Sequence, residues 1–129
     1  MIQSDAKKIS ILIVEDDDDC RAVLSDLLEM DGYSVIACHN AHHAVETAKT
    51  ALPALILVDY MMPDADGGWV VRKLREQGGA IAAVPVVLTT GSSTGREIAE
   101  KLGIRSLEKP FDINRLLELV RLLVPQGKA

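Results

Sequence analysis

The chain has 129 residues, a length typical of one domain, with 48% hydrophobic and 26% charged residues. These are ordinary globular values, which exclude a disordered chain and a coiled-coil rod. A net charge of −5 disfavours direct binding to nucleic acid, and aromatic residues, at 3%, are too few for base-stacking platforms. Because no apolar run approaches the ~18 residues of a membrane span, we expect a cytoplasmic protein without membrane contact.

Five short runs rich in β-branched and aliphatic residues predict strands. They are Ile9–Val14, Tyr33–Cys38, Leu55–Val58, Pro85–Thr89 and Ile104–Leu107. The middle runs are almost continuously apolar, which is typical of strands that are covered on both faces of a parallel sheet. The two cysteines, Cys20 and Cys38, form no metal-type pair and are expected to be reduced.

Helical patterns lie between the strands. The first begins at an Asp17 or Asp18 cap, ends before Gly32 and carries an apolar stripe of Cys20, Val23, Leu24, Leu27 and Leu28. The next are predicted from the cap Asn40 to before Pro53, from about Asp66 to Gln77 with Gly78 and Gly79 as its end, and over Thr94–Leu102. The last has Asp112 as cap, Pro125 as stop and an apolar side of Ile113, Leu116, Leu117, Val120 and Leu123.

Strand and helix alternate five times, which predicts a doubly wound α/β fold with a parallel sheet and helices on both faces. We expect polar tails over residues 1–8 and 125–129 and one domain over residues 9–124. In such folds the ligand site lies at the carboxyl ends of the strands.

Acidic residues gather at that predicted edge. Glu15 and Asp16 follow the first strand, and Asp59 ends the buried run LILVD. Carboxylates ~5 Å apart repel by roughly 3 kcal/mol at an effective dielectric constant of 20, so a positive group must lie among them. Three hard oxygen ligands from separate loops favour Mg²⁺ over zinc or copper.

Thr90 and Lys109 follow the fourth and fifth strands and offer a hydroxyl donor and an ammonium. Together they suit the oxygens of a phosphoryl group. The plain alternatives are a helix cap for Thr90 and a salt bridge for Lys109. Similarly, Asp17, Asp18 and Asp19 are as readily explained by helix capping and the helix dipole.

These residues occur in an order that resembles the receiver domains of two-component response regulators, over Ile9 to Val124. The resemblance depends on Glu15-Asp16 with Arg21, on D-x-x-x-P-x-x-D-G, on Thr90-Gly91 and on Lys109-Pro110-Phe111; the second motif consists of Asp59, Pro63, Asp66 and Gly67. It implies the flavodoxin-like (βα)5 fold with strand order 2-1-3-4-5.

The resemblance also implies roles for the site residues. Asp59 would accept a phosphoryl group from a phosphohistidine and become an aspartyl phosphate. Mg²⁺, with Mn²⁺ as a substitute, would be held by Asp16, Asp59 and the backbone carbonyl of Met61, with Glu15 acting through water. Thr90 and Lys109 would each contact a phosphoryl oxygen, so these contacts would exist only in the modified state.

Further features follow from the same comparison. Lys109-Pro110 is expected to be a cis peptide. Ser106 stands where the family often has an aromatic residue, Glu108 stands where an apolar one is common, and the turn before the fifth strand is short. Apart from the resemblance, His39, His42 and His43 could bind a transition metal or receive a phosphoryl group, but solvated polar residues are normal at a helix start, and we interpret them so. Trp69 is interpreted as a partly exposed or packing residue and not as a platform for a ligand.

The sequence therefore predicts a receiver module that switches its affinity for a protein target after phosphorylation, and not a turnover enzyme. Its partners would be a sensor histidine kinase or a histidine phosphotransfer protein. One alternative is a docking module of the same fold that is not phosphorylated. Another is an aspartyl-phosphate hydrolase, which is disfavoured because Met61 stands where such enzymes place a second carboxylate.

Overall fold

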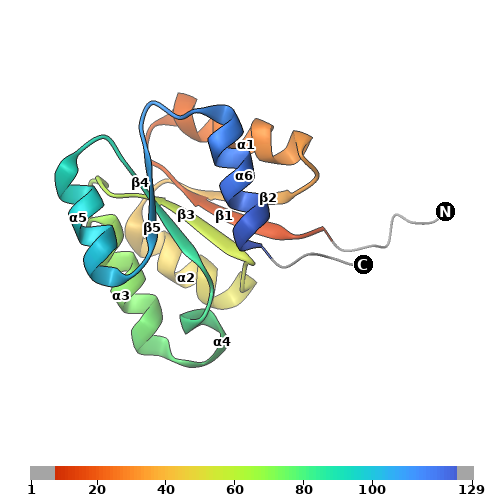
Figure 1. The fold of residues 1–129 in the computed structure, drawn as a ribbon. Helices are drawn as coiled ribbons and strands as arrows, with labels where there is room; N and C mark the ends of the chain where they lie inside the picture. Colours follow the sequence, from red (N-terminus) through yellow and green to blue (C-terminus); the bar gives the residue numbers. More distant parts are fainter. Residues whose placement is uncertain (1–7, 125–129) are drawn as a thin grey trace.

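A computed structural model of the chain describes residues 8–124 and shows a five-stranded parallel sheet flanked by helices (Figure 1). The strands lie in the order β2-β1-β3-β4-β5, which confirms the order implied by the resemblance. Their bounds are β1 Ser10–Val14, β2 Ser34–Cys38, β3 Leu55–Asp59, β4 Val86–Thr90 and β5 Arg105–Glu108. All five lie at the predicted places, with ends that differ by one residue.

The burial of the strands follows their positions in the sheet. Every residue of β3 and β4 is buried, and these are the runs whose continuous apolar character predicted cover on both faces. The two edge strands, β2 and β5, have exposed positions. Asp59 is the last residue of β3, not the first after it, so a carboxylate is part of a buried strand.

Four of the helices begin at the predicted places, directly after Asp17, Asn40, Asp66 and Asp112. Their bounds are α1 Asp18–Met30, α2 Ala41–Ala51, α3 Gly67–Gln77, α4 Gly79–Ala82, α5 Ser93–Leu102 and α6 Ile113–Leu123. Side chains of Asp17, Asn40, Asp66 and Asp112 accept a hydrogen bond from the first turn of α1, α2, α3 and α6 respectively.

Two apolar layers hold the helices against the sheet. On one face, Leu24 and Leu28 of α1 pack with Leu116 and Val120 of α6 against β1 and β3. On the other face, residues of α2, α3 and α5 form the second layer, and Ile81 of α4 joins it at the edge. Figure 1 shows α1 and α6 together on one side of the sheet and α2 and α3 on the other.

Three predictions about the helices were wrong. Val23 and Ile113 were expected to face inward, but their exposed fractions are 55% and 49%. Each apolar stripe is wider than the face that meets the sheet. In α6, Leu119 is buried beside Leu116 and Val120, and its burial was not predicted. The short helix α4 was also missed, because four residues after a Gly78-Gly79 break carry too little pattern.

Three further predictions concern the cysteines, membrane spans and the two ends of the chain. Both cysteines are free thiols, as expected. Among residues 8–124 no helix combines the length and the apolar character that crossing a bilayer requires. The predicted tails 1–8 and 125–129, apart from Lys8, and the stop at Pro125 lie outside the described residues.

Candidate functional site

The predicted site residues meet at the carboxyl end of the sheet. Glu15 follows β1, Asp59 ends the neighbouring strand β3, and Thr90 ends β4 beside it. Lys109 follows β5, and its backbone N–H donates to the carbonyl of Thr90 at 3.0 Å. Adjacent parallel strands therefore bring together residues that are far apart in the sequence.

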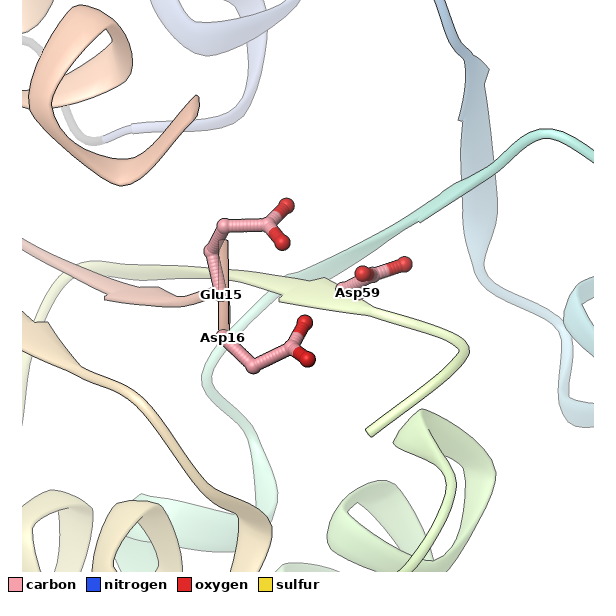
Figure 2. Close-up of side chains that lie close together, drawn as sticks. All are labelled: Glu15, Asp16 and Asp59. Carbon is pink, nitrogen blue, oxygen red and sulfur yellow. The ribbon is translucent and has the colours of Figure 1, made fainter. Parts of the chain in front are cut away.

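Three carboxylates form a compact cluster at this edge. One carboxylate oxygen each from Glu15, Asp16 and Asp59 lies within 4.8 Å of the others. Glu15 and Asp59 are buried, with exposed fractions of 1% and 7%, whereas Asp16 is exposed. Figure 2 shows all three carboxyl groups extending to the same side of the strand ends. The cluster offers hard oxygen ligands with one side open to solvent, as a divalent cation requires.

The ammonium of Lys109 lies among these acids. Its Nζ is 2.7 Å from Oε1 of Glu15 and 3.1 Å from Oδ2 of Asp59. The plain alternative of a salt bridge is therefore correct, and Lys109 already has partners in the unmodified protein. Its predicted contact with a phosphoryl oxygen remains a prediction, but that contact would replace or supplement existing ion pairs.

The electrostatic environment shifts the pKa values of the two buried acids in opposite directions. Burial raises the pKa of Asp59 and the nearby charge of Glu15 raises it further, and Lys109 offsets these effects only in part. Burial also acts on Glu15, but hydrogen bonds from Lys109 and the Asp17 amide outweigh it and lower the pKa of Glu15. The same ion pairs overcome the effect of burial on Lys109 and raise its pKa.

The segment after β1 is fixed by hydrogen bonds to its own backbone. Asp17 N–H donates to Oε2 of Glu15 at 3.1 Å, and the guanidinium of Arg21 donates to the Glu15 carbonyl at 2.8 Å. Arg21 also pairs with Asp18. The thiol of Cys20 lies 3.3 Å from Oε1 of Glu15, and burial together with this carboxylate raises the pKa of the thiol to about 11.

The loop after Asp59 turns tightly back toward the sheet. The N–H of Met61 donates to Oδ1 of Asp59 at 3.3 Å, and the N–H of Gly67 donates to the Tyr60 carbonyl at 2.9 Å. A Cβ on Gly67 would lie 2.7 Å from the Asp59 carbonyl oxygen and 2.5 Å from Leu88. The D-G step of the motif is therefore required by close packing against the strand that carries Asp59.

Thr90 is buried, and its hydroxyl contacts Ser92. Ser92 N–H donates to Oγ1 of Thr90 at 3.0 Å, and the two hydroxyl oxygens are 3.2 Å apart. The cap of α5 is Ser92, so the alternative role of Thr90 as a helix cap was wrong. A Cβ on Gly95 would overlap the Thr90 side chain, which shows how closely α5 approaches the end of β4.

The cis peptide at Lys109-Pro110 is confirmed. The departures from the family pattern lie beside it, where Ser106 borders a cavity of about 380 Å³ together with Arg96, Glu108 and Arg115. An ion pair of 3.2 Å between Arg96 and Glu108 joins α5 to β5 across this region.

The three histidines do not gather as a metal site. In the part of the chain that the structure describes, only Glu15, Asp16 and Asp59 form a group of three or more potential ligands. His42 instead contacts Asp64 through Nδ1 at 2.6 Å, and its ring packs against Trp69 with the centroids 4.5 Å apart and the planes tilted by 40°. Trp69 is half-buried, which agrees with its interpretation as a packing residue.

Comparison with known proteins identifies the family. Residues 11–121 match the family model of the response regulator receiver domain. The chain is a response regulator receiver domain. Among curated proteins, it is 37% identical over 128 residues to the response regulator Rre1 of Synechocystis, covering 96% of this chain and 55% of that protein. It is 32% identical over 117 residues to the transcriptional regulatory protein CpxR of Escherichia coli, covering 88% of this chain and 48% of CpxR.

Solved receiver structures are similar over nearly the whole domain. The chemotaxis protein CheY4 of Vibrio cholerae superposes with a TM-score of 0.82 at 25% identity, covering 92% of this chain and 100% of CheY4. A putative response regulator from Chloroflexus aurantiacus gives a TM-score of 0.84 at 26% identity, with 91% and 98% of the two chains covered. The receiver domain spans about half the length of the curated relatives that it matches. The family is a signalling module of two-component systems and not a class of turnover enzymes.

Sequence reasoning missed two groups that shape the receiver domain's site. Asp64 links the β3–α3 loop to α2 by a hydrogen bond, and Gly95 packs on Thr90. Asp64 lies in the acidic, turn-rich stretch between β3 and α3, but its partners are 22 and 23 residues earlier in the chain. No local pattern indicates a contact of that range.

Proposed function

We propose that this receiver domain takes a phosphoryl group onto Asp59 from a phosphohistidine of a sensor kinase or phosphotransfer protein. The observation that carries the proposal is a buried carboxylate at the end of β3, beside two further acids and the Lys109 ammonium. Burying ionised carboxylates together is costly, so such an arrangement favours a chemical role.

The transfer balances as one displacement at phosphorus. A carboxylate oxygen of Asp59 forms the new P–O bond while the P–N bond to the donor imidazole breaks. The imidazole leaves with the electron pair of that bond and takes up a proton. Water later attacks the aspartyl phosphate and returns the Asp59 carboxylate and inorganic phosphate, so the site is restored.

The residues present fit a magnesium ion. The three carboxylates and the single ammonium of Lys109 carry a formal charge of −2, three negative groups less one positive, which a divalent cation would balance. Asp16 and Asp59 would be direct ligands with the Met61 carbonyl, and Glu15, whose oxygens are engaged by Lys109 and the Asp17 amide, would act through water. Bound there, the ion would neutralise charge on the transferring group.

Two other side chains would respond to the phosphoryl group. Lys109 would exchange part of its pairing with Asp59 for a phosphoryl oxygen, and Thr90 would turn its hydroxyl from Ser92 toward another. These contacts differ between the two states, and such a difference is what lets phosphorylation change the affinity for a partner. A cytoplasmic setting and a downstream protein target belong to this proposal.

Mass measurement after phosphorylation tests the proposal. The protein is incubated with Mg²⁺ and acetyl phosphate, or with a phosphorylated kinase, and its intact mass is determined. We expect the mass of one added phosphoryl group on the native chain and none on Asp59→Asn or without the metal. An added phosphoryl mass on Asp59→Asn would show that Asp59 is not the acceptor. An unlabelled native chain with several competent donors would favour the alternative of a docking module.

A further inference from the structure

Asp64 joins the loop that follows Asp59 to the start of α2. Its Oδ1 accepts from the backbone N–H of Ala41 at 2.9 Å, and its Oδ2 accepts from the backbone N–H of His42 at 2.9 Å. The Nδ1 of His42 is 2.6 Å from the same Oδ2. One carboxylate thus satisfies two N–H groups in the first turn of α2 from a segment distant in the sequence.

The contact is reinforced by a third element. The ring of His42 packs at a tilt against Trp69 of α3, and the Lys73 ammonium lies 5.8 Å from the centroid of the Trp69 ring. Although burial by itself would raise the pKa of Asp64, the hydrogen bonds from Ala41 and His42 hold that pKa well below its usual range. Asp64 is therefore ionised at neutral pH, the form in which both of its oxygens accept hydrogen bonds.

The remainder of the loop is held partly by packing, because Met62 and Ala65 lie against the apolar layer on that face of the sheet. Tyr60 is fixed by its N–H to the Thr89 carbonyl at 2.8 Å, and Asp66 by its cap on Trp69. Between them, Met61 is 68% exposed, and its N–H donates to Oδ1 of Asp59 at 3.3 Å. Among residues 8–124, the hydrogen bonds that residues 62–65 make to other elements all come from Asp64.

We propose that Asp64 is a positioning residue that holds the Met61 peptide in place and in this way sets the affinity of the site for a divalent cation. The inference rests on the proposed function, in which the Met61 carbonyl is a ligand. Hydrogen bonds hold the loop at Tyr60 and at the Met61 N–H before the Met61 carbonyl, and at Asp64 after it. Removal of the anchor at Asp64 leaves the carbonyl free to sample other orientations, which costs affinity without removing a ligand.

Magnesium titration of three variants tests the role of Asp64. Asp64→Ala removes both backbone contacts, whereas Asp64→Asn keeps one amide oxygen as an acceptor. Asn40→Ala is the matched control, because Asn40 caps the same helix through His43 N–H at 2.8 Å but does not touch the loop. Each protein is titrated with MgCl₂ while amide shifts of residues 15–17 and 59–61 are followed by NMR, and amide exchange of Met61 and Gly67 is measured without metal.

We expect the dissociation constant for Mg²⁺ to rise by about tenfold in Asp64→Ala, by less in Asp64→Asn, and to stay unchanged in Asn40→Ala. Exchange at Met61 should be faster in Asp64→Ala alone. If Asp64→Ala binds Mg²⁺ like the native chain, or if Asn40→Ala weakens binding equally, Asp64 has no positioning role. If the native chain itself shows no saturable Mg²⁺ binding, the proposed metal site fails, and unchanged exchange at Met61 would separately refute the anchoring.

Discussion

Glu15 and Lys109 are 94 residues apart in the chain and form an ion pair of 2.7 Å. Because the same ammonium is 3.1 Å from Asp59, one lysine partly neutralises both buried acids. Asp59 nevertheless keeps a raised pKa, and Glu15 a lowered one. The unmodified domain therefore holds unfavourable charge at the residue that we propose as acceptor.

This unfavourable charge predicts that Asp59→Asn stabilises the domain at pH 7. A carboxyl group whose pKa is raised on folding binds its proton more readily in the native state, so the native protein gains stability as the pH falls toward that pKa. Removing the charge should raise the free energy of unfolding by about 1 kcal/mol at pH 7. Urea denaturation at pH 7 and pH 5 should show a smaller difference in the free energy of unfolding between Asp59→Asn and the native chain at the lower pH. If the two proteins are equally stable at pH 7, the charge of Asp59 is not unfavourable in the folded domain.

Lys109→Ala should have the opposite effect. Without the ammonium, two buried carboxylates face each other, and we expect the free energy of unfolding to fall by roughly 2 kcal/mol at pH 7. This is less than the cost for a fully buried pair, because the Lys109 side chain is 27% exposed. The loss should shrink as the pH falls and one carboxylate takes up a proton. Lys49→Ala, which removes a surface pair with Glu46 at 3.2 Å, is the control and should cost no more than about 0.5 kcal/mol.

The sequence predicted the sheet and the acidic cluster because both depend on short-range patterns. The apolar run that contains Leu57 marks a strand buried on both faces, and parallel strands bring their ends to one edge. A salt bridge of Lys109 was predicted only as an alternative to its contact with a phosphoryl group, and its two partners were not named. The pairing depends on the conformation of a flexible side chain. The attraction joins two residues that are 94 positions apart in the sequence, and such a pair produces no periodic pattern.

Gly95→Ala should destabilise the domain, although Ala is the better helix former. Gly95 lies in the first turn of α5 against Thr90, and an added methyl group would overlap that side chain. We expect a cost of about 2 kcal/mol and an altered environment of the Thr90 methyl group in NMR spectra. Gly91→Ala is the matched control, because a Cβ added there would meet no atom within 4 Å. A stabilising Gly95→Ala would show that α5 is not closely packed on Thr90.

Leu52→Gly should stabilise the end of α2. Leu52 is the helix cap and has a φ of 48°, a left-handed conformation that costs a non-glycine residue about 1 kcal/mol. Its side chain is 49% exposed, so little packing is lost. Thermal unfolding should show a higher Tm for Leu52→Gly than for Leu52→Ala, which keeps the backbone strain. A Tm for the glycine variant at or below that of the alanine variant would contradict this explanation.

The contacts of Asp64 and Gly95 mark the limit of sequence reasoning in a different way. Each depends on how closely a loop or helix start approaches a neighbouring element. That distance is set by the packing of whole helices on the sheet, not by the residues at the contact. The exposure of Val23 was mispredicted for the same reason, because periodicity gives the direction of an apolar stripe but not the width of the surface that covers it.

Chemical identification of the modified residue tests the central claim most directly. The protein is phosphorylated in the presence of Mg²⁺ and then reduced with borohydride, which converts an aspartyl phosphate to a primary alcohol, and the modified peptide is sequenced by mass spectrometry. We predict reduction at Asp59 alone, and none in protein incubated without a phosphoryl donor. Reduction at Glu15 or Asp16 with Asp59 intact would contradict the account of a buried acceptor at the end of β3.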